Sequence, residues 1–384
     1  MTTQDYLEKL IAFDTTSALS NIALIDWVEG ILVPLGADVQ IIRNADGSKA
    51  NIFATIGPAD RPGVMLSGHT DVVPVAGQNW SRPAFEMTRL GDNLYGRGTT
   101  DMKGFVAAML TAAHQASKQP LDTPLHLALS YDEEIGCMGV RSLIDMLALA
   151  QQRPKMCIVG EPTGLTVATG HKGKCAARAH FNGLAGHSAL APFAINAVYM
   201  ASDFITALRN IQEELQNGSM QDHGYDVPYT TLHVGRIEGG GALNIVPQNC
   251  WLDFEIRNIS QDNPVEILER LQASCDEIVT EAQKIAPDAG IEINVSNTYP
   301  GLDTPETSQV VAFVKSLTGA NSTRKVAFGT EGGLFDQRLG VPTVVCGPGD
   351  MAQGHKADEF ITRTQLDLCD EMLANLVSRL IVGL

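Results

Sequence analysis

The stretch 125–136 constrains the fold of this chain more than any other. It opens with the apolar run 125–130, which has the length and composition of a buried strand, and Gly136 provides a break after it. Two adjacent carboxylates, Glu133 and Glu134, stand where this strand should end. Neighbouring side chains of extended backbone point to opposite sides, so one could hold a metal while the other handles a proton. A solvated acidic turn is the alternative that this stretch alone leaves open.

Strands and helices alternate along the first half of the chain. We expect strands at 37–42, 50–56, 64–67, 125–130 and 156–159, and helices within 5–34, 102–117 and 140–150. This alternation indicates an α/β fold with a mostly parallel sheet and helices on both faces. A strand at 341–346 and a closing helix from Thr364 should complete the same domain.

The pattern changes between residues 174 and 297. The expected elements there are strands at 175–182, 230–237, 245–258 and 291–297, and helices that start at Pro192 and Pro264. Their order, β-α-β-β-α-β, is that of the ferredoxin-like fold. A chain of 384 residues is long enough for two domains. We therefore expect a discontinuous first domain, 1–173 and 298–384, and an inserted α+β domain, 174–297.

Charge and cysteine content disfavour several classes of protein. The chain has 44 acidic and 27 basic residues and a formal net charge of -17, which argues against nucleic acid and anionic membranes as partners. No apolar run reaches the roughly 18 residues of a membrane-spanning helix, and the N-terminus shows no secretory signal pattern. Seven widely spaced cysteines without a Cys-x-x-Cys pair indicate a reducing compartment. We expect a cytoplasmic protein.

Other predicted strands are also followed by histidine or carboxylate side chains, as the strand 125–130 is. The residues that follow them or lie in neighbouring loops are His69, Asp71, Asp101, Glu161 and His355. Ligands of open parallel sheets gather at the carboxyl ends of the strands, so these side chains should meet Glu133 and Glu134 there. So many carboxylates would repel one another strongly unless divalent cations lay among them.

The donor types indicate which cations fit. Carboxylate and imidazole without thiolate suit zinc, cobalt or manganese. The number of donor groups favours two ions roughly 3.5–4 Å apart, bridged by a carboxylate, over a single ion. Taken alone, His69 could be an ordinary core or surface histidine and Asp101 a helix cap. A metal site is favoured because coincidence would have to recur at every strand end.

Five short segments resemble the signatures of a known family. They are His-Thr-Asp at 69–71, Gly-Thr-Thr-Asp-Met-Lys-Gly at 98–104, Asp-Glu-Glu-Ile-Gly at 132–136, Gly-Glu-Pro-Thr at 160–163 and Gln-Gly-His-Lys at 353–356. In this order, around an insertion of this size, they resemble the dizinc aminoacylase and carboxypeptidase family over nearly the whole chain. The resemblance implies hydrolysis of an amide bond at two zinc ions, with cobalt as the other candidate metal.

The resemblance also implies which residues hold the metals. It makes Asp101 the carboxylate that bridges both ions. His69 and Glu161 would complete one metal site. Glu134 and His355 would complete the other.

Two further residues of the first domain receive roles from the resemblance. Asp71 would orient His69. Glu133 would be the general base, which takes a proton from the attacking water and passes it to the leaving amine. The substrate would be a small N-acyl amino acid, and the sequence leaves its acyl group and the native metal open.

The resemblance extends to the inserted domain, which would serve as a lid and join two chains in a homodimer. His187 would reach the active site of the partner subunit and hydrogen bond the tetrahedral oxyanion. Asn244 and Arg257 would bind the substrate carboxylate, for which the arginine fork is suited. Glu331 of the first domain, in a glycine-rich loop, could pair with a cationic amine of the substrate. On the residues alone these are a loop histidine, polar strand residues and a solvated glutamate.

Two other classes of function compete with this interpretation. Gly347-Pro348-Gly349 after a strand suggests a nucleotide-dependent oxidoreductase, but Ala352 stands where a third glycine belongs and no helix is expected to begin there. A non-catalytic binding relative is the second competitor. It is disfavoured because every candidate metal ligand and Glu133 are present.

Overall fold

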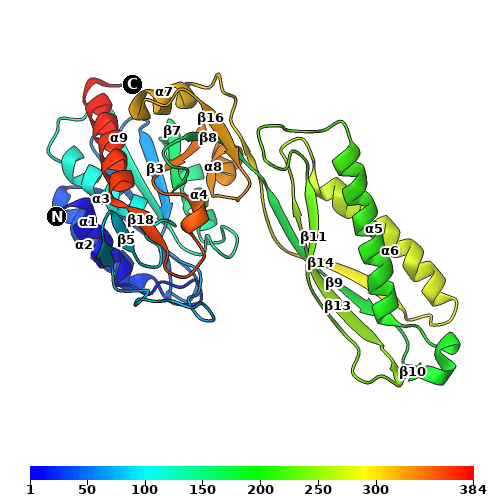
Figure 1. The fold of residues 1–384 in the computed structure, drawn as a ribbon. Coiled ribbons are helices and arrows are strands. Elements are labelled where there is room, and N and C mark those ends of the chain that lie inside the picture. Colours follow the sequence, from blue (N-terminus) through cyan, green and yellow to red (C-terminus); the bar gives the residue numbers. More distant parts are fainter. The chain divides into compact units, whose positions relative to one another are not determined.

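The computed structural model describes residues 1–384 and shows two compact units (Figure 1). Unit 1 comprises Met1–His171 and Leu302–Leu384, and unit 2 comprises Lys172–Gly301. Unit 2 is therefore an insertion in the sequence of unit 1. None of the helices is long and apolar enough to cross a membrane.

A nine-stranded mixed sheet forms the middle of unit 1, in the order β1-β2-β6-β3-β7-β17-β8-β15 with β16 beside β8. The strands are β1 Asp38–Arg43, β2 Ala50–Ile56, β3 Val64–His69, β6 Leu125–Ser130, β7 Met156–Pro162, β8 Val167–His171, β15 Leu302–Asp303, β16 Thr323–Val326 and β17 Thr343–Gly347. The central strands β6, β3, β7 and β17 are parallel, and antiparallel strands extend the sheet on both sides. The predicted α/β class, with a mostly parallel sheet, is confirmed.

The central strands are buried along their whole length. Burial on both faces explains why they read as continuous apolar runs in the sequence. β8 is equally buried but was not predicted. Its short sequence, Val-Ala-Thr-Gly-His, mixes apolar and polar residues and gives no apolar run.

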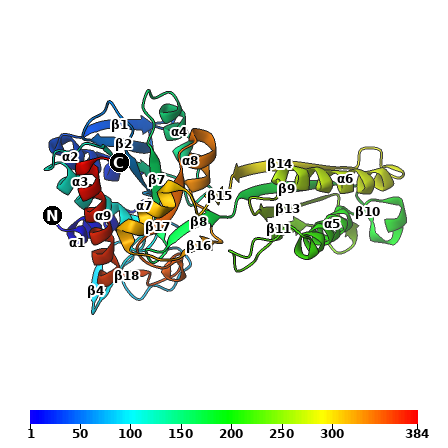
Figure 2. The same ribbon diagram turned by 90° about the horizontal axis from the view of Figure 1, so that it is seen from above.

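Helices cover both faces of this sheet (Figures 1 and 2). Those on one face share a hydrophobic core with the strands: α1 Thr3–Ile11, α2 Ile22–Leu32, α3 Lys103–Ala116, α7 Gln309–Thr318 and α9 Arg363–Val382. On the other face α4 Val140–Ala148 packs against α8 Gly332–Leu339. The glycine-rich start of α8 concealed this helix in the sequence.

Shorter elements complete unit 1. A three-stranded sheet is formed by β4 Thr88–Leu90, β5 Asn93–Tyr95 and β18 Phe360–Thr362. Two short 3-10 helices are η1 Val33–Leu35 and η3 Met351–Gln353.

The predicted start of the last helix at Thr364 is wrong. The hydroxyl of Thr362 caps α9 instead, because it accepts a hydrogen bond from the main-chain N–H of Gln365 at 3.1 Å.

Unit 2 has the predicted ferredoxin-like order. Its elements are β9 Lys174–Asn182, α5 Ala197–Asn217, β11 Thr231–Gly239, β13 Asn249–Arg257, α6 Pro264–Gln283 and β14 Gly290–Tyr299. The strands form an antiparallel sheet in the order β11-β13-β9-β14. Burial alternates along β9 and β13, because only one sheet face packs against α5 and α6. Phe181, Phe204 and Phe254 meet edge to face in this core.

Two predictions in unit 2 are corrected. The helix expected from Pro192 begins only at Ala197, because the side chain of Asn196 caps its N-terminus and Pro192 lies in the 3-10 turn η2 Ser188–Phe193. The strand expected at 245–258 is divided. β12 Ile245–Val246 pairs with β10 Gly186–His187 in a separate two-stranded ribbon, and only β13 belongs to the main sheet.

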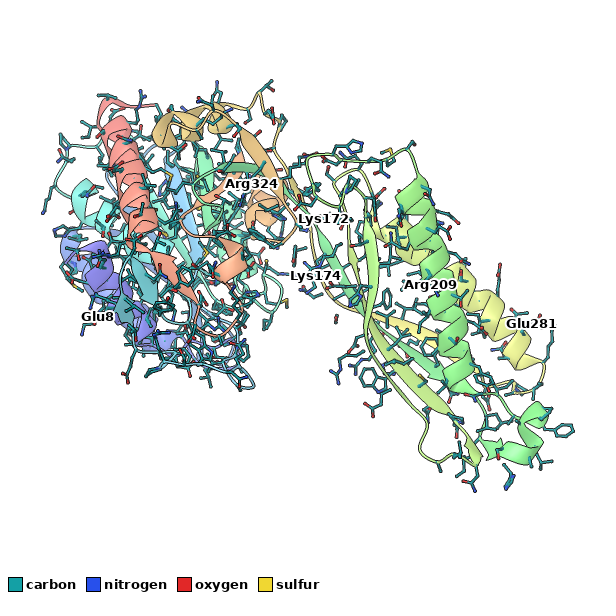
Figure 3. All side chains as sticks on the ribbon, viewed as in Figure 1. Glu8, Lys172, Lys174, Arg209, Glu281 and Arg324 are labelled. Carbon is teal, nitrogen blue, oxygen red and sulfur yellow. The ribbon has the colours of Figure 1, made fainter.

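The helices of unit 2 expose charged side chains. Arg209 on α5 and Glu281 on α6 are both exposed (Figure 3). At the first residue of β9, Lys174 forms an ion pair with Glu255 at 3.6 Å. The apolar side chains of both helices face the sheet, as expected for amphipathic helices.

Candidate metal centre and active site

The carboxylate of Asp101 lies between two histidines. Its Oδ1 is 3.0 Å from Nε2 of His69, and its Oδ2 is 3.0 Å from Nε2 of His355. Asp101 is buried, so both oxygens face protein groups. One oxygen for each imidazole is the arrangement that a carboxylate bridging two cations requires.

Each histidine has a second carboxylate beside it. Oε1 of Glu161 lies 3.6 Å from Nε2 of His69, and Oε2 of Glu134 lies 2.9 Å from Nε2 of His355. With Asp101 shared, the predicted ligands form two donor sets: His69, Asp101 and Glu161 in the first, and His355, Asp101 and Glu134 in the second. All of them belong to unit 1.

The parallel part of the sheet brings these residues together. His69 is the last residue of β3 and pairs in register with Ser130, the last residue of β6, after which Glu133 and Glu134 follow. Glu161 lies near the end of β7, the other neighbour of β3. Three adjacent strands therefore deliver their polar side chains to one edge, as expected from the sequence.

Two of the predicted ligands come from loops and not from strands. Asp101 precedes α3. His355 follows η3 and has a φ of +59°, in the left-handed region that residues other than glycine seldom adopt. Its ring is half-exposed, whereas the side chains of the other predicted ligands are nearly covered.

The electrostatics of the cluster reflect crowded carboxylates. Burial and the charge of Asp101 raise the pKa of Glu134 to about 7 and that of Glu161 well above its usual value. Hydrogen bonds to Asp101 and Glu134 raise the pKa of His355 to about 10. Without a cation, these groups would therefore retain protons near neutral pH, and bound cations would take the place of those protons.

The residues present fit such cations. Donor atoms of His69, Asp101 and Glu134 lie within 4.8 Å of one another. Oε1 of Glu134 is buried and has no hydrogen-bond partner, which is costly for a carboxylate oxygen unless a cation satisfies it. Oxygen and imidazole nitrogen donors suit zinc and other divalent transition metals.

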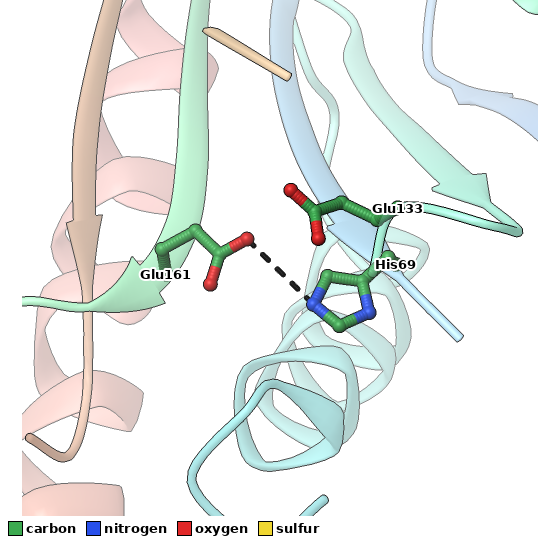
Figure 4. Close-up of side chains that lie close together, drawn as sticks. All are labelled: His69, Glu133 and Glu161. Atoms are coloured by element: carbon green, nitrogen blue, oxygen red, sulfur yellow. Dashed lines mark ion pairs between the residues drawn. The ribbon is translucent and has the colours of Figure 1, made fainter. Parts of the chain in front are cut away.

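Glu133 stands next to the first donor set. Its carboxylate and that of Glu161 point toward the same space beside the ring of His69 (Figure 4). Donor atoms of these three residues also lie within 4.8 Å of one another. Burial raises the pKa of Glu133 well above its usual value, and the thiol of Cys137 donates a hydrogen bond to its Oε1 at 3.4 Å. Glu133 is placed where it could exchange a proton with a group held at the first donor set.

Asp71 supports both His69 and Glu133. Nδ1 of His69 bonds the main-chain carbonyl oxygen of Asp71 at 2.9 Å, closer than the carboxylate at 3.5 Å. The carboxylate accepts hydrogen bonds from the main-chain N–H of Glu133 at 3.1 Å and of Glu134 at 3.2 Å, and from the hydroxyl of Ser17 at 2.7 Å. Asp71 thus fixes the imidazole through its main chain and the two-glutamate turn through its side chain.

Glu331 lies at the start of α8 and is only 1% exposed. Its Oε2 accepts a hydrogen bond from the hydroxyl of Ser67 at 3.2 Å, and its Oε1 has no partner. Burial raises the pKa of Glu331 to about 7. The alternative of a solvated glutamate in a glycine-rich turn is wrong, because Glu331 is buried at the start of α8.

The candidate residues of unit 2 fall into two places. His187 lies in β10 and pairs in register with Ile245, next to Asn244, whose carbonyl accepts a hydrogen bond from Ser188 N–H at 3.0 Å. Arg257 ends β13, about 26 Å along that strand from Asn249 by the usual rise per residue. Arg257 bonds Oε1 of Glu255 at 3.1 Å and the hydroxyl of Tyr299 at 3.2 Å. Unit 2 therefore brings His187 and Asn244 together but not Arg257.

Sequence reasoning missed the residues that support the cluster. Ser17, Ser67 and Cys137 contact Asp71, Glu331 and Glu133 through a hydroxyl or thiol. Single serines and cysteines carry no spacing signal, so no pattern could have identified them.

Comparison with known proteins decides the family. Residues 65–379 match the model of peptidase family M20/M25/M40. The chain belongs to this family. The expected family relationship is confirmed, and this M20/M25/M40 chain is a metal-dependent hydrolase that acts on amide bonds.

Curated relatives of this M20/M25/M40 chain include acetylornithine deacetylases. One from Myxococcus xanthus is 33% identical over 382 residues, which cover 98% of this chain and 97% of the relative. One from Pasteurella multocida (strain Pm70) is 32% identical over 388 residues, with 97% of both chains covered. Both relationships extend over nearly the full length.

Solved structures support the fold. A tripeptidase from Staphylococcus aureus has a TM-score of 0.78 at 20% identity, with 99% of this chain and 98% of that chain covered. An M20 family metallo-carboxypeptidase from Sulfolobus solfataricus has a TM-score of 0.77 at 19% identity, with 99% of both chains covered. Both likenesses cover nearly the whole of this chain and therefore include the sheet of unit 1 and the inserted unit 2.

Proposed function

We propose that this protein is an acetylornithine deacetylase, which hydrolyses N2-acetyl-L-ornithine to L-ornithine and acetate in arginine biosynthesis. One observation supports hydrolysis above all others. The carboxylate of Asp101 lies between His69 and His355, and Glu133 lies beside His69. The full-length relatives of that name support the choice of substrate.

Two divalent cations would complete the site, zinc first and cobalt as the alternative. His69, Asp101 and Glu161 would hold one, and Asp101, Glu134 and His355 the other. When bound, such cations polarise the amide carbonyl and lower the pKa of water.

Glu133 would act as the general base. Its carboxylate takes a proton from the attacking water and delivers it to the nitrogen of the leaving amine, so that the product leaves as ornithine. Asp71 holds the main chain of Glu133 in place for this transfer. Burial raises the pKa of Glu133, which favours the protonated form that delivers the proton to the leaving amine.

We also propose a homodimer joined through unit 2. Large apolar side chains are exposed around the β10–β12 ribbon: Leu190, Phe193, Tyr199, Leu243 and Ile245. Three of them, Tyr199, Leu243 and Ile245, line a cavity of about 620 Å³. An exposed apolar patch of this kind is typical of a surface that another chain covers, and a second copy is the occupant proposed here.

In such a dimer His187 and Asn244 would serve the active site of the partner subunit, where His187 would hydrogen bond the oxyanion and Asn244 the substrate carboxylate. Arg257 would bind the same carboxylate through its guanidinium.

Glu331 would recognise the cationic side chain of ornithine. Its free Oε1 and its burial leave a carboxylate oxygen for an ammonium group to satisfy. Glu331→Gln should lower kcat/KM for N-acetylornithine more than for a neutral N-acetyl amino acid, measured on the same preparation. Equal losses on both substrates would contradict this role.

A reducing cellular compartment suits the protein. All of its seven cysteines are free and buried, as is usual for proteins kept away from oxidising surroundings. This supports a cytoplasmic location.

The function is tested with a panel of substrates. It contains N-acetylornithine, N-succinyl-diaminopimelate, neutral N-acetyl amino acids and dipeptides, each assayed with and without a chelator. The proposal predicts the highest kcat/KM on N-acetylornithine, loss of activity with chelator and recovery with zinc or cobalt. Preference for the succinyl compound or a neutral N-acetyl amino acid would assign the chain to a desuccinylase or aminoacylase instead.

A further inference from the structure

A buried ion pair, Arg97 and Glu359, lies beside the two donor sets and belongs to neither of them. Arg97 is 1% exposed and Glu359 is fully buried, and Nη1 of Arg97 donates a hydrogen bond to Oε2 of Glu359 at 2.5 Å. The other oxygen of Glu359 accepts hydrogen bonds from the main-chain N–H of Thr100 at 2.9 Å and of Asp101 at 3.1 Å. Glu359 therefore fixes the main chain of the carboxylate that lies between both histidines.

The same pair reaches His355 through a third residue. Nη2 of Arg97 donates to Oε1 of Gln78 at 2.5 Å, and Nε2 of Gln78 donates to the main-chain carbonyl oxygen of His355 at 3.0 Å. The indole N–H of Trp80 also donates to Oε1 of Gln78, and the guanidinium of Arg97 lies 5.1 Å from the centre of the Trp80 ring. These contacts fix the amide of Gln78 so that its N–H points at His355.

A continuous series of contacts thus joins the main chains of two metal ligands. It runs from Asp101 through Glu359, Arg97 and Gln78 to His355. The side chains of Asp101 and His355 face each other at the other end, 3.0 Å apart. The loop that carries His355 holds it at a φ of +59°, which costs energy unless surrounding contacts fix it.

Stability alone is a weak reason for such a pair. Removing two charges from water is costly, and well-packed apolar residues often stabilise a fold as well or better. In the first donor set His69 and Glu161 are held by the central strands β3 and β7. In the second donor set His355 comes from a loop and depends on other support.

We propose that Gln78, Arg97 and Glu359 are positioning residues that set the affinity of the donor sets for their cations, Gln78 through His355 of the second set and Glu359 through Asp101, with Arg97 between them. This inference rests on the proposed two-cation site. Of the metal ligands, Gln78 contacts only His355 directly, whereas Glu359 contacts Asp101, which both sets share. Replacement of Gln78 should therefore weaken cation binding at the second donor set only. Replacement of Glu359 should weaken cation binding at both sets.

The test is calorimetric titration of zinc into metal-free protein. The variants Glu161→Gln and Glu134→Gln assign the two binding events to the first and second donor sets. Gln78→Leu should lower the zinc affinity of the second donor set about 10- to 100-fold, the usual effect of losing a hydrogen bond that orients a ligand. The zinc affinity of the first donor set should not change. Gln115→Leu, the same change at an exposed position of α3, is the matched control and should bind as the unaltered protein does.

Glu359→Gln provides the second arm and should weaken both events. Gln78 is only partly buried, so Gln78→Leu keeps the test available if the buried change prevents folding. Unchanged affinities in Gln78→Leu, or an equal loss at both sets, would overturn the inference. Fewer than two ions bound by the unaltered protein would overturn the two-cation site itself, and this inference with it.

Discussion

The carboxylate of Asp71 accepts a hydrogen bond from the main-chain N–H of Glu133 at 3.1 Å. The same carboxylate binds the N–H of Glu134, so one side chain fixes both glutamates that follow β6. Asp71 also contacts His69 on the neighbouring strand β3. A single residue, through its carbonyl and its carboxylate, therefore sets the spacing between a proposed metal ligand of one strand and the proposed base of the next.

Asp71→Asn should lower kcat about 10- to 100-fold, as is typical for residues that orient metal ligands. An amide has one acceptor oxygen, and its NH2 group would face the N–H of Glu133 or Glu134. Ser17→Ala, which removes a donor but leaves both main-chain contacts, is the control and should reduce kcat less. Steady-state kinetics check this prediction, and wild-type kcat in Asp71→Asn would contradict it.

Glu133→Gln should keep both metals and lose roughly 10² to 10⁴ in kcat, the usual contribution of a positioned base. Metal content and kcat are measured on the same sample. Near-normal turnover with full metal would remove Glu133 from the role of base. Loss of metal in Glu133→Gln would instead indicate that Glu133 is a metal ligand, which its position near His69 and Glu161 also allows.

Mixing two inactive variants tests whether His187 acts across subunits. His187→Ala lacks the proposed oxyanion donor, and Glu133→Gln lacks the base. A mixed dimer would contain one complete site, so activity should return after subunits exchange. Exchange is followed with differently tagged chains, and the absence of activity in proven mixed dimers would refute the role in the partner site.

A buried histidine away from the metals predicts a pH effect on stability. His126 stacks on Phe53 with ring centres 5.2 Å apart, and its Nδ1 lies 2.9 Å from the hydroxyl of Thr55. Burial lowers its pKa to about 4. The unfolded chain, with an ordinary pKa of about 6.5, binds this proton first, so the free energy of unfolding should fall as pH drops from about 6.5 to about 4.

His126→Phe removes that titration and should flatten this part of the pH profile, by something of the order of 3 kcal/mol at most. Denaturant unfolding at several pH values measures it. His223→Phe, a change at an exposed histidine, should retain the wild-type slope. Equal slopes in His126→Phe and wild type would show that another group controls the profile.

Much of the fold was predictable because its central strands are continuous apolar runs bounded by glycine and charge. The same strands place His69, Glu133, Glu134 and Glu161 at their ends, so the grouping of these residues followed from the topology of the sheet. The ferredoxin-like order of unit 2 was equally visible, because its strands alternate and its helices are long.

What the sequence could not reveal depends on contacts between distant segments. α8 begins with two glycines, and the helix expected from Pro192 starts later because Asn196 caps it. Gln78 and Glu359 meet through Arg97, although they are far apart in the chain and no local pattern marks either of them. Such residues are identified only when their partners are known.

Metal titration with turnover as the readout shows whether two cations, shared by Asp101, are needed for hydrolysis. Zinc or cobalt is added in measured equivalents to metal-free protein, and hydrolysis of N-acetylornithine is followed at each step, with Asp101→Ala as the control. If two cations share Asp101, full activity requires two equivalents of metal per chain, and Asp101→Ala stays inactive at any metal concentration. Full turnover by metal-free protein in chelator, or no hydrolysis of N-acetylornithine with both ions bound, would contradict it.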